Sequence, residues 1–246
     1  MLKTTYSNEN DSIIIVGVNS GIGQALAGSL LSAGVEIFGI DIQNESSISP
    51  REKLHYYECK PQDEVALHKI AMQIKDIRKM HSGLVNLSGA ISHFDKITEL
   101  RAEDWKYTYD ISFRSCYNAC RVFADYLDHP SSIVNMSSGL AFGGQKGYGP
   151  YAAAKASIIS ITKTLATELA PHIRVNSVAP GAVNTDFIKN DKGETRFSIE
   201  DYQKITPLGN MASPEEIADV IMFLLSDGSR HITGQCIHVN GGALMV

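Results

Sequence analysis

The stretch Ser12-Ile13-Ile14-Ile15-Val16-Gly17-Val18-Asn19-Ser20-Gly21-Ile22-Gly23 decides the fold of this chain. A β-branched run leads into a turn with three glycines, and a helix-length segment follows. Glycines placed in this way let the backbone approach a diphosphate while N–H groups at the helix start point toward it. The pattern predicts a dinucleotide-binding turn, with contacts from Gly17, Asn19, Ser20, Gly21, Ile22 and Gly23.

Short β-branched runs recur along the chain with helix-length segments between them. The predicted strands are Ser12–Gly17, Val35–Asp41, Leu54–Cys59, Leu84–Ser88, Ser132–Ser137, Arg174–Ala179 and Cys236–Val239. The predicted helices are Gly21–Ala33, Asp63–Lys79, Ala102–Leu127, Tyr151–Leu169 and Pro214–Leu225. This alternation is typical of an α/β fold, and the strands lack the polar alternation of a sheet with one solvated face. We predict a single-domain, Rossmann-like, doubly wound parallel sheet of about seven strands, with helices on both faces, over residues 1–246.

Two polar stretches interrupt this pattern. Residues 43–50 are rich in turn-forming residues, so we predict a short loop there with room for one helical turn. The stretch Asp186–Ile205 is also polar and has no clear period. It has two interpretations, a mobile flap over an active site or an ordinary solvated loop.

The composition narrows the possible partners and the location. The chain has 246 residues, of which 43% are hydrophobic, enough for one substantial core. A net charge of −5 gives no basic footprint for nucleic acid or an anionic membrane, so we expect neither as a partner. The first eleven residues are polar, and no apolar run approaches the ~18 residues of a membrane span. We therefore expect a soluble, cytoplasmic protein.

Four cysteines are too few for a disulfide scaffold in a chain of this size, and none forms a Cys-x-x-Cys pair. Reduced thiols fit the cytoplasm. Cys116 and Cys120 share one helical face, which is compatible with a metal site, but no histidine or second pair stands at ligand spacing. We expect these two thiols to pack in the core and expect no metal.

An acidic residue ends the second predicted strand. Asp41 lies 18 residues after Gly23, where a carboxylate can accept hydrogen bonds from both hydroxyls of an adenosine ribose. It would repel the 2′-phosphate of NADP, and Ser20 and Ile42, which could have held a compensating cation, are uncharged. The pattern predicts NAD as the cofactor. The alternative is a surface carboxylate that simply ends a strand.

A further signal is Tyr151-Ala-Ala-Ala-Lys155, in which the tyrosine stands thirteen residues after Ser138. Residues four apart share a helical face, so the ammonium of Lys155 can lie near the phenol of Tyr151 and lower its pKa. That pKa must fall from about 10 to about 7 or 8 for base catalysis at neutral pH. One charge at ~4 Å suffices only in a partly enclosed site. The alternative is an exposed tyrosine and lysine without coupling.

Together these motifs resemble those of the short-chain dehydrogenase/reductase family over nearly the whole chain. Further motifs that carry the resemblance are Asn86-Leu87-Ser88-Gly89, Pro180-Gly181-Ala182-Val183-Asn184-Thr185, and the ending Ile232-Thr233-Gly234-Gln235 with Val239-Asn240-Gly241-Gly242. The resemblance implies an oxidoreductase that transfers hydride between a nicotinamide cofactor and a secondary alcohol or ketone.

The resemblance also implies catalytic roles. Tyr151 would be the general acid/base, Lys155 would hold the nicotinamide ribose and lower the tyrosine pKa, and Ser138 would hydrogen-bond the substrate oxygen. In the family an asparagine seven residues after the helix tryptophan helps to place a water in a proton relay. Here the tryptophan is Trp105 and the relay position is Ser112, whose hydroxyl is expected to substitute in part.

Cofactor and substrate contacts follow from the same resemblance. Val183 and Thr185 would contact the nicotinamide carboxamide, and Asn86 would lie beside the adenosine. Gln145 and Tyr148 would line the substrate cleft and favour a hydrogen-bonding substrate. The other implied cofactor contacts, besides Tyr151 and Lys155, are Gly89, Pro180 and Gly181.

Four further positions depart from the family pattern. Val16 and Leu87 replace polar side chains that tie neighbouring strands, which we expect to affect stability more than catalysis. Lys60 stands where an aspartate reads the adenine amine, and Pro61 stands where a backbone N–H is used. A charged lysine has no acceptor and a proline no donor, so adenine must be held by other means.

The leading hypothesis is an NAD-dependent oxidoreductase acting on a small polar, sugar-like or cyclic substrate. One alternative is 3-oxoacyl-[acyl-carrier-protein] reductase, against which Asp41 and Asn210 weigh. Another is a cofactor-binding protein with lost or weak catalysis. The resemblance also implies a homotetramer, or a homodimer, assembled through Ala102–Leu127, Tyr151–Leu169 and the last strand.

Overall fold

A seven-stranded parallel sheet forms the centre of the molecule, with the strand order β3-β2-β1-β4-β5-β6-β7. The computed structural model describes residues 11–49, 52–79, 81–189, 195 and 197–246. The strands are β1 Ser12–Val16, β2 Glu36–Asp41, β3 Leu54–Glu58, β4 His81–Asn86, β5 Leu127–Met136, β6 Ile173–Pro180 and β7 Cys236–Val239. The strand order reverses between β1 and β4, and in such sheets a crevice opens there at the carboxyl ends of the strands. The predicted fold class is confirmed.

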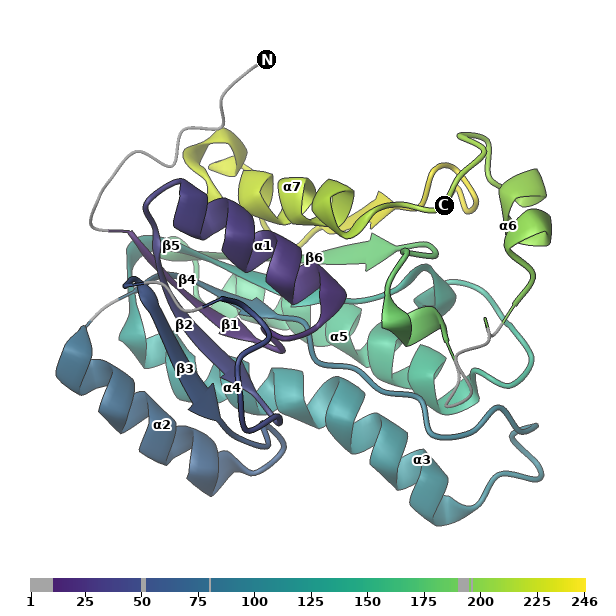
Figure 1. Cartoon of the computed structure of the whole chain (residues 1–246), viewed down its shortest axis with the longest axis horizontal. Coiled ribbons are helices and arrows are strands. Elements are labelled where there is room, and N and C mark those ends of the chain that lie inside the picture. Colours follow the sequence, from purple (N-terminus) through teal and green to yellow (C-terminus); the bar gives the residue numbers. More distant parts are fainter. Residues whose placement is uncertain (1–10, 50–51, 80, 190–194, 196) are drawn as a thin grey trace.

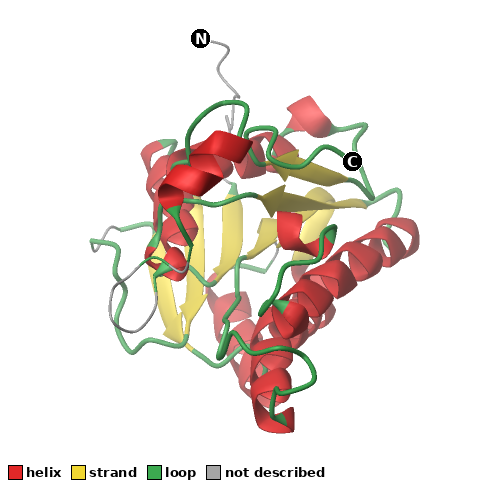
Figure 2. Cartoon of the chain, turned by 90° about the vertical axis from the view of Figure 1, so that its right-hand side faces the viewer, coloured by secondary structure: helices red, strands yellow, loops and turns green. Residues whose placement is uncertain are grey.

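Helices cover both faces of the sheet, as Figures 1 and 2 show. The helices are α1 Gly21–Ser32, α2 Glu64–Ile77, α3 Ala102–Tyr109, α4 Ser115–Phe123, α5 Gly149–Glu168, α6 Ile199–Ile205 and α7 Pro214–Leu225. α1 and α7 pack on one face, whereas α2, α4 and α5 pack on the other. None of these helices has the length and apolar character needed to span a bilayer.

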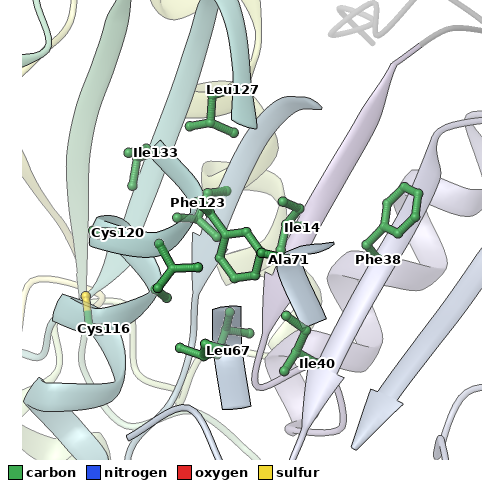
Figure 3. Close-up of a cluster of buried hydrophobic side chains, with 14 of the residues drawn as sticks. Ile14, Phe38, Ile40, Leu67, Ala71, Cys116, Cys120, Phe123, Leu127 and Ile133 are labelled. Carbon is green, nitrogen blue, oxygen red and sulfur yellow. The ribbon is translucent and has the colours of Figure 1, made fainter. Parts of the chain in front are cut away.

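Successive residues of β1 supply two separate cores. Ile14 and Val16 belong to the cluster under α2, α4 and α5, and Ile13 and Ile15 belong to the cluster under α1 and α7. Side chains on a strand alternate between its faces, so an unbroken apolar run fills both cores. Figure 3 shows the first cluster, where Ile14 lies near Phe123.

Cys116 and Cys120 lie in this first core, as predicted from the sequence (Figure 3). Both are buried free thiols. Within the described parts of the chain, no group of three histidine, cysteine or acidic side chains could hold a metal.

The helix predicted over Ala102–Leu127 is present as a continuous helical path from Ala102 to Tyr126, but it is not one regular α-helix. A π-helical turn, Asp110–Arg114, separates α3 from α4, and the helical path ends with a short 3₁₀ turn at Tyr126. Leu127 instead begins β5 and pairs with His81 of β4.

The segment Asp186–Ile205 is more ordered than predicted. It contains a 3₁₀ turn at Asp186–Ile188 and the helix α6, whose start is capped by the Ser198 hydroxyl accepting from the N–H of Asp201. The most polar part of the predicted flap, residues 190–194, lies outside the described residues, as does 196. Helix α6 could not be predicted from the sequence, because a helix this short has too few turns for its apolar residues to show a helical period.

The connection from β2 to β3 has no helical turn in its described part, residues 42–49. Other boundaries differ from the predictions by a few residues. The largest functional consequence is at α5, which begins at Gly149 with Pro150 in its first turn, so Tyr151 already lies inside the helix.

Candidate active site

The glycine turn between β1 and α1 is shaped for close backbone approach. Gly17 has a φ of +88°, which favours glycine. A Cβ on Gly23 would lie 2.5 Å from the carbonyl oxygen of Gly17, and one on Gly21 would lie 2.6 Å from the Thr185 methyl group. The turn, the helix start and the loop after β6 therefore meet without room for a side chain between them.

The start of α1 presents donors to this space. The Ser20 hydroxyl accepts from the N–H of Gly23 at 3.0 Å and caps the helix. The N–H groups of Gly21 and Ile22 have no carbonyl to bind within the helix, because they belong to its first turn. Both residues line the large cavity of the protein. Free donors at a helix N-terminus fit a diphosphate.

Asp41 lies at the end of β2, beside this turn. One carboxylate oxygen accepts from the backbone N–H of Asn19 at 2.9 Å and the other from that of Ile42 at 2.8 Å. A carboxylate has about four acceptor sites, so capacity remains for two hydroxyls. Asp41 does not appear in the lining of the cavity, although its neighbours Asn19 and Gln43 do.

The Asn86 side chain points away from the predicted adenosine position. Its amide donates to Asn135 Oδ1 at 2.8 Å and to Cys120 Sγ at 3.3 Å, inside the core. Only its backbone could face a cofactor. Gly89, three residues further on, does line the cavity, and a Cβ there would lie 3.3 Å from Lys155 Nζ.

The loop after β6 supplies another wall of the cavity. Four of the positions predicted there to contact cofactor line it: Pro180, Gly181, Val183 and Thr185. Tyr202 of α6 reaches this loop, and its hydroxyl accepts from the N–H of Ala182 at 2.8 Å.

Lys155 is buried behind Tyr151. Its Nζ donates to the carbonyl oxygens of Ser88 at 3.1 Å and Met136 at 2.8 Å, and it lies 5.5 Å from the centroid of the Tyr151 ring. These bonds hold the ammonium at the ends of two neighbouring strands. It is therefore fixed beside the phenol rather than free in solvent.

The two serines at the end of β5 have different partners. The Ser137 hydroxyl donates to the carbonyl oxygen of Lys155 at 2.9 Å, so it is used within the scaffold. Ser138 hydrogen-bonds with Tyr151. Ser138, Tyr151 and Lys155 all line the cavity.

The pKa of Tyr151 differs from the sequence-based expectation. Burial raises this pKa well above its usual value, the Ser138 hydrogen bond opposes the rise, and Tyr148 adds to it. Burial also lowers the pKa of Lys155 to about 8, against an opposing effect of Cys116. The protein's own groups therefore raise this pKa, and a fall driven by Lys155 together with the oxidised cofactor stays a prediction. Those groups keep the phenol protonated near neutral pH.

Ser112 lies in the π-helical turn and not at the lysine. Its hydroxyl donates to the carbonyl oxygen of Ala90 at 3.1 Å and accepts from the N–H of Ala90 at 3.2 Å. This pairing fixes the chain just after Gly89. Ser112 is fully buried and does not line the cavity, so its part in a proton relay stays a prediction.

The segment after β3, which contains Lys60 and Pro61, is hydrogen-bonded to helix α4. The Pro61 carbonyl oxygen and that of Gln62 both accept from the Asn118 amide, at 3.1 and 3.0 Å. Asn118 thereby ties this segment to α4. Neither Lys60 nor Pro61 lines the cavity.

The cavity has a volume of about 1150 Å³ and runs from the glycine turn past Tyr151 to α6. Gln145 and Tyr148 line it, as predicted. Sequence reasoning missed the apolar wall of this cavity, which includes Ile91, Leu140, Phe187, Phe197, Ile205 and Leu244. These residues come from separate loops and from α6, and no spacing in the sequence links them.

Comparison with known proteins supports the same family. The family model described as enoyl-(acyl carrier protein) reductase matches residues 17–243. The chain therefore belongs to the short-chain dehydrogenase/reductase family of oxidoreductases.

Several relatives match over almost their whole length. The chain is 32% identical to a 3-oxoacyl-[acyl-carrier-protein] reductase of Thermotoga maritima, over 96% of this chain and 99% of the relative. It is 31% identical to a 2,3-dihydro-2,3-dihydroxybenzoate dehydrogenase of Bacillus subtilis, over 96% and 97%. A solved glucose/ribitol dehydrogenase-type structure from Brucella melitensis superposes with a TM-score of 0.89 at 29% identity, covering 96% of this chain and 98% of that one.

Proposed function

We propose that this protein is an NAD-dependent oxidoreductase that interconverts a secondary alcohol and a ketone. The observation that carries the proposal is the placement of Ser138, Tyr151 and Lys155 on one cavity that also reaches the phosphate-binding turn. A hydride-transfer site needs a proton-exchanging group beside the nicotinamide ring, and a dinucleotide bound along this cavity would meet that need.

The side chains divide the chemistry between them. Ser138 would hydrogen-bond the substrate oxygen and hold it near the Tyr151 hydroxyl. Tyr151 would give its proton to the forming alkoxide in reduction or take a proton from the alcohol in oxidation. Lys155 would bind the nicotinamide ribose and favour the ionised phenol. Bound NAD would supply the hydride acceptor, and its reduced form the donor.

The raised pKa of Tyr151 bears on the direction of the reaction. A protonated phenol is ready to act as the acid in ketone reduction. Alcohol oxidation needs the ionised form, which the positive charges of Lys155 and oxidised nicotinamide would favour together. We therefore expect oxidation to require a higher pH than reduction.

The preference for NAD rests on Asp41 and its surroundings. The carboxylate would accept from the ribose hydroxyls and repel a 2′-phosphate. The described residues 41–49 contain no cation, and Glu45 adds a second negative charge. NAD, not NADP, is the cofactor that suits this end of the cavity.

The residues of the cavity wall narrow the class of substrate that we propose. Tyr151, Tyr148 and Phe187 line the cavity; Tyr151 packs on the Phe187 ring at a centroid distance of 5.6 Å, and Tyr148 meets Phe94, outside the lining, edge-on at 4.9 Å. Gln145 adds hydrogen-bonding capacity beside this aromatic surface. Among small polar, sugar-like and cyclic substrates, these walls favour a cyclic one with an apolar face and a hydroxyl or ketone on its edge. The name of the Bacillus relative points to a ring of this kind.

A second candidate, 3-oxoacyl-[acyl-carrier-protein] reductase, is favoured by the name of the Thermotoga relative. Asp41 weighs against it, because this activity is expected to use NADP. The exposed Asn210 also weighs against it, since it stands where a basic residue often follows Pro-Leu-Gly.

A third candidate is a binding protein with weak catalysis. Ser112 and the Lys60-Pro61 pair motivate it, and the raised tyrosine pKa adds to it. The retained Ser138, Tyr151 and Lys155 set argues against it.

One pair of experiments separates the three. NADH and NADPH binding is titrated first, and turnover is then assayed on cyclic diols, sugars and 3-oxoacyl thioesters. The proposal expects NADH to bind more tightly and cyclic alcohols to turn over. Preference for NADPH with thioester reduction would favour the second candidate, and binding without turnover the third.

We propose that residues 1–246 form a single catalytic domain. We also propose that the protein is cytoplasmic and assembles as a homotetramer or a homodimer. Supporting this, the helices from α3 to α4 expose Trp105, Tyr107 and Tyr117, and Tyr109, Phe113 and Tyr117 form a row of neighbouring rings. Aromatic side chains of this kind are enriched in interfaces. A monomeric mass in solution would contradict the proposal.

A further inference from the structure

The loop after β2 folds back over the glycine turn, and the Asn19 side chain of that turn makes three hydrogen bonds to it. Asn19 donates from its amide to Gln43 Oε1 at 2.9 Å and to the Glu45 carbonyl oxygen at 2.8 Å. Its own side-chain oxygen accepts from the N–H of Ser47 at 2.8 Å. The connection has no helix of its own in residues 42–49. Hydrogen bonds from the Asn19 side chain help to fix its conformation instead.

Tyr56 of β3 fixes the same loop from the other side. Its hydroxyl donates to the carbonyl oxygen of Gln43 at 2.6 Å and accepts from the Asn19 amide at 3.1 Å. Burial raises the pKa of Tyr56 to about 12, and the nearby charge of Asp41 adds to the rise. The phenol thus remains a neutral donor at physiological pH.

The loop held in this way begins directly at the Asp41 carboxylate, which accepts from the N–H of Ile42, the first residue of the loop. Asp41 is only 9% exposed, and each carboxylate oxygen already accepts one backbone N–H, from Asn19 or from Ile42. Gln43 is the residue of the loop that reaches the cavity lining. Two ribose hydroxyls need little room beside the carboxylate, whereas a phosphate needs room for three further oxygens and for its hydration.

We propose that Asn19 is a positioning residue that holds residues 42–49 as a wall beside Asp41, so that space as well as charge excludes a 2′-phosphate. The inference rests on the dinucleotide site of the proposed function. It implies that removing the charge of Asp41 does not by itself create an NADP site. The wall has to be released as well.

The test measures NADH and NADPH binding by calorimetry, independently of turnover, for the wild type, Asp41→Ser, Asn19→Ala, and the double variant. We expect Asp41→Ser to weaken NADH binding and to leave NADPH binding poor. Adding Asn19→Ala should then tighten NADPH binding about tenfold relative to Asp41→Ser alone, which corresponds to about 1.4 kcal/mol.

Tyr56→Phe, combined with Asp41→Ser, tests the same wall without touching the glycine turn. Tyr57→Phe in the same background is the matched control, because Tyr57 is the next residue on β3 and packs on the opposite face of the sheet. Hydrogen exchange should rise in residues 42–49 for Asn19→Ala and Tyr56→Phe, and not for Tyr57→Phe. These readouts remain usable if one variant folds poorly.

Tight NADPH binding by Asp41→Ser alone would overturn the inference, since charge would then suffice. Equal NADPH affinity in the single and double variants would overturn it too. A wild type that binds a dinucleotide but turns over no alcohol contradicts the proposed function and leaves this inference standing. A wild type that binds neither dinucleotide contradicts both.

Discussion

The two ends of the cavity are built differently. At the cofactor end, buried groups bind one another through the backbone, and Asn19, Asp41 and Lys155 are 6%, 9% and 1% exposed. At the substrate end, the wall consists of loop and α6 side chains, of which Phe187 is 41% and Ile205 65% exposed. This contrast fits the proposed function, in which the buried end would hold the cofactor and the more exposed end the substrate.

The largest expected effect is at Lys155, where the two ends meet. Lys155→Met keeps the length of the side chain but removes the charge beside Tyr151, and the carbonyl groups of Ser88 and Met136 lose their donor. We expect kcat/KM to fall by about 10³-fold, within the range for loss of acid–base assistance. Steady-state kinetics measures this.

Lys163→Met on the exposed side of the same helix is the control and should leave kcat/KM within about twofold, as surface changes usually do. A loss of less than tenfold for Lys155→Met would show that the buried ammonium is structural only.

The next effect concerns the buried end. A methyl group at Gly23 would meet the backbone at 2.5 Å, so Gly23→Ala should destabilise the protein by about 3 kcal/mol and weaken NADH binding. Chemical denaturation and NADH titration measure the two effects.

Gly28→Ala is the matched control, since it lies in the same helix and a Cβ there meets nothing within 4 Å. It should be neutral or stabilise by up to ~1 kcal/mol. Equal behaviour of the two variants would mean that the turn is not tightly packed.

A third prediction concerns His81, the first residue of β4 in the central sheet. His81 is buried against Ser12 and Phe38, and burial lowers its pKa to about 4 from the usual 6.5. Between these pH values the unfolded chain binds the proton and the folded protein does not, so stability falls as pH drops from 6.5 to 4. The loss reaches about 3 kcal/mol.

Denaturation series across this pH range should show the step, and His81→Gln should remove most of it while lowering stability at neutral pH. A step of the same size in His81→Gln would assign the effect to other groups.

The smallest effect is expected at the more exposed end of the cavity, where Phe187 lies. Phe187→Ala removes a ring beside Tyr151, and we expect KM for a cyclic substrate to rise about fivefold, or about 1 kcal/mol, with kcat little changed. Phe142→Ala is the control, because Phe142 is similarly exposed but packs on His238 outside the cavity lining. If both variants raise KM equally, the aromatic wall does not contact substrate.

The same contrast explains what the sequence could predict. The turn at Gly17–Gly23, the end of β2 at Asp41, and the Tyr151 and Lys155 pair follow from local spacing, so sequence placed them well. The aromatic wall, α6 and the Asn19 network depend on contacts between residues far apart in the chain. The π-helical turn Asp110–Arg114 within the long helical path has no signal in the sequence either.

The tyrosine pKa could not be predicted from spacing because it depends on burial. Proximity to Lys155 argued for a lower pKa, but removal from water has the larger effect and raises it. The direction of the Asn86 side chain could not be predicted either, and a contact of this residue with the adenosine stays a prediction. The strand position of Asn86 was right, but its partners Asn135 and Cys120 lie in the core.

The most direct test of the account compares Tyr151→Phe with the wild type in two measurements on the same preparation, NADH binding and hydride transfer with a cyclic secondary alcohol. The account predicts NADH affinity within about twofold and turnover reduced by about 10³-fold, because only the exchangeable proton is lost. Turnover that survives in Tyr151→Phe would contradict the claim that this phenol is the proton-transfer group.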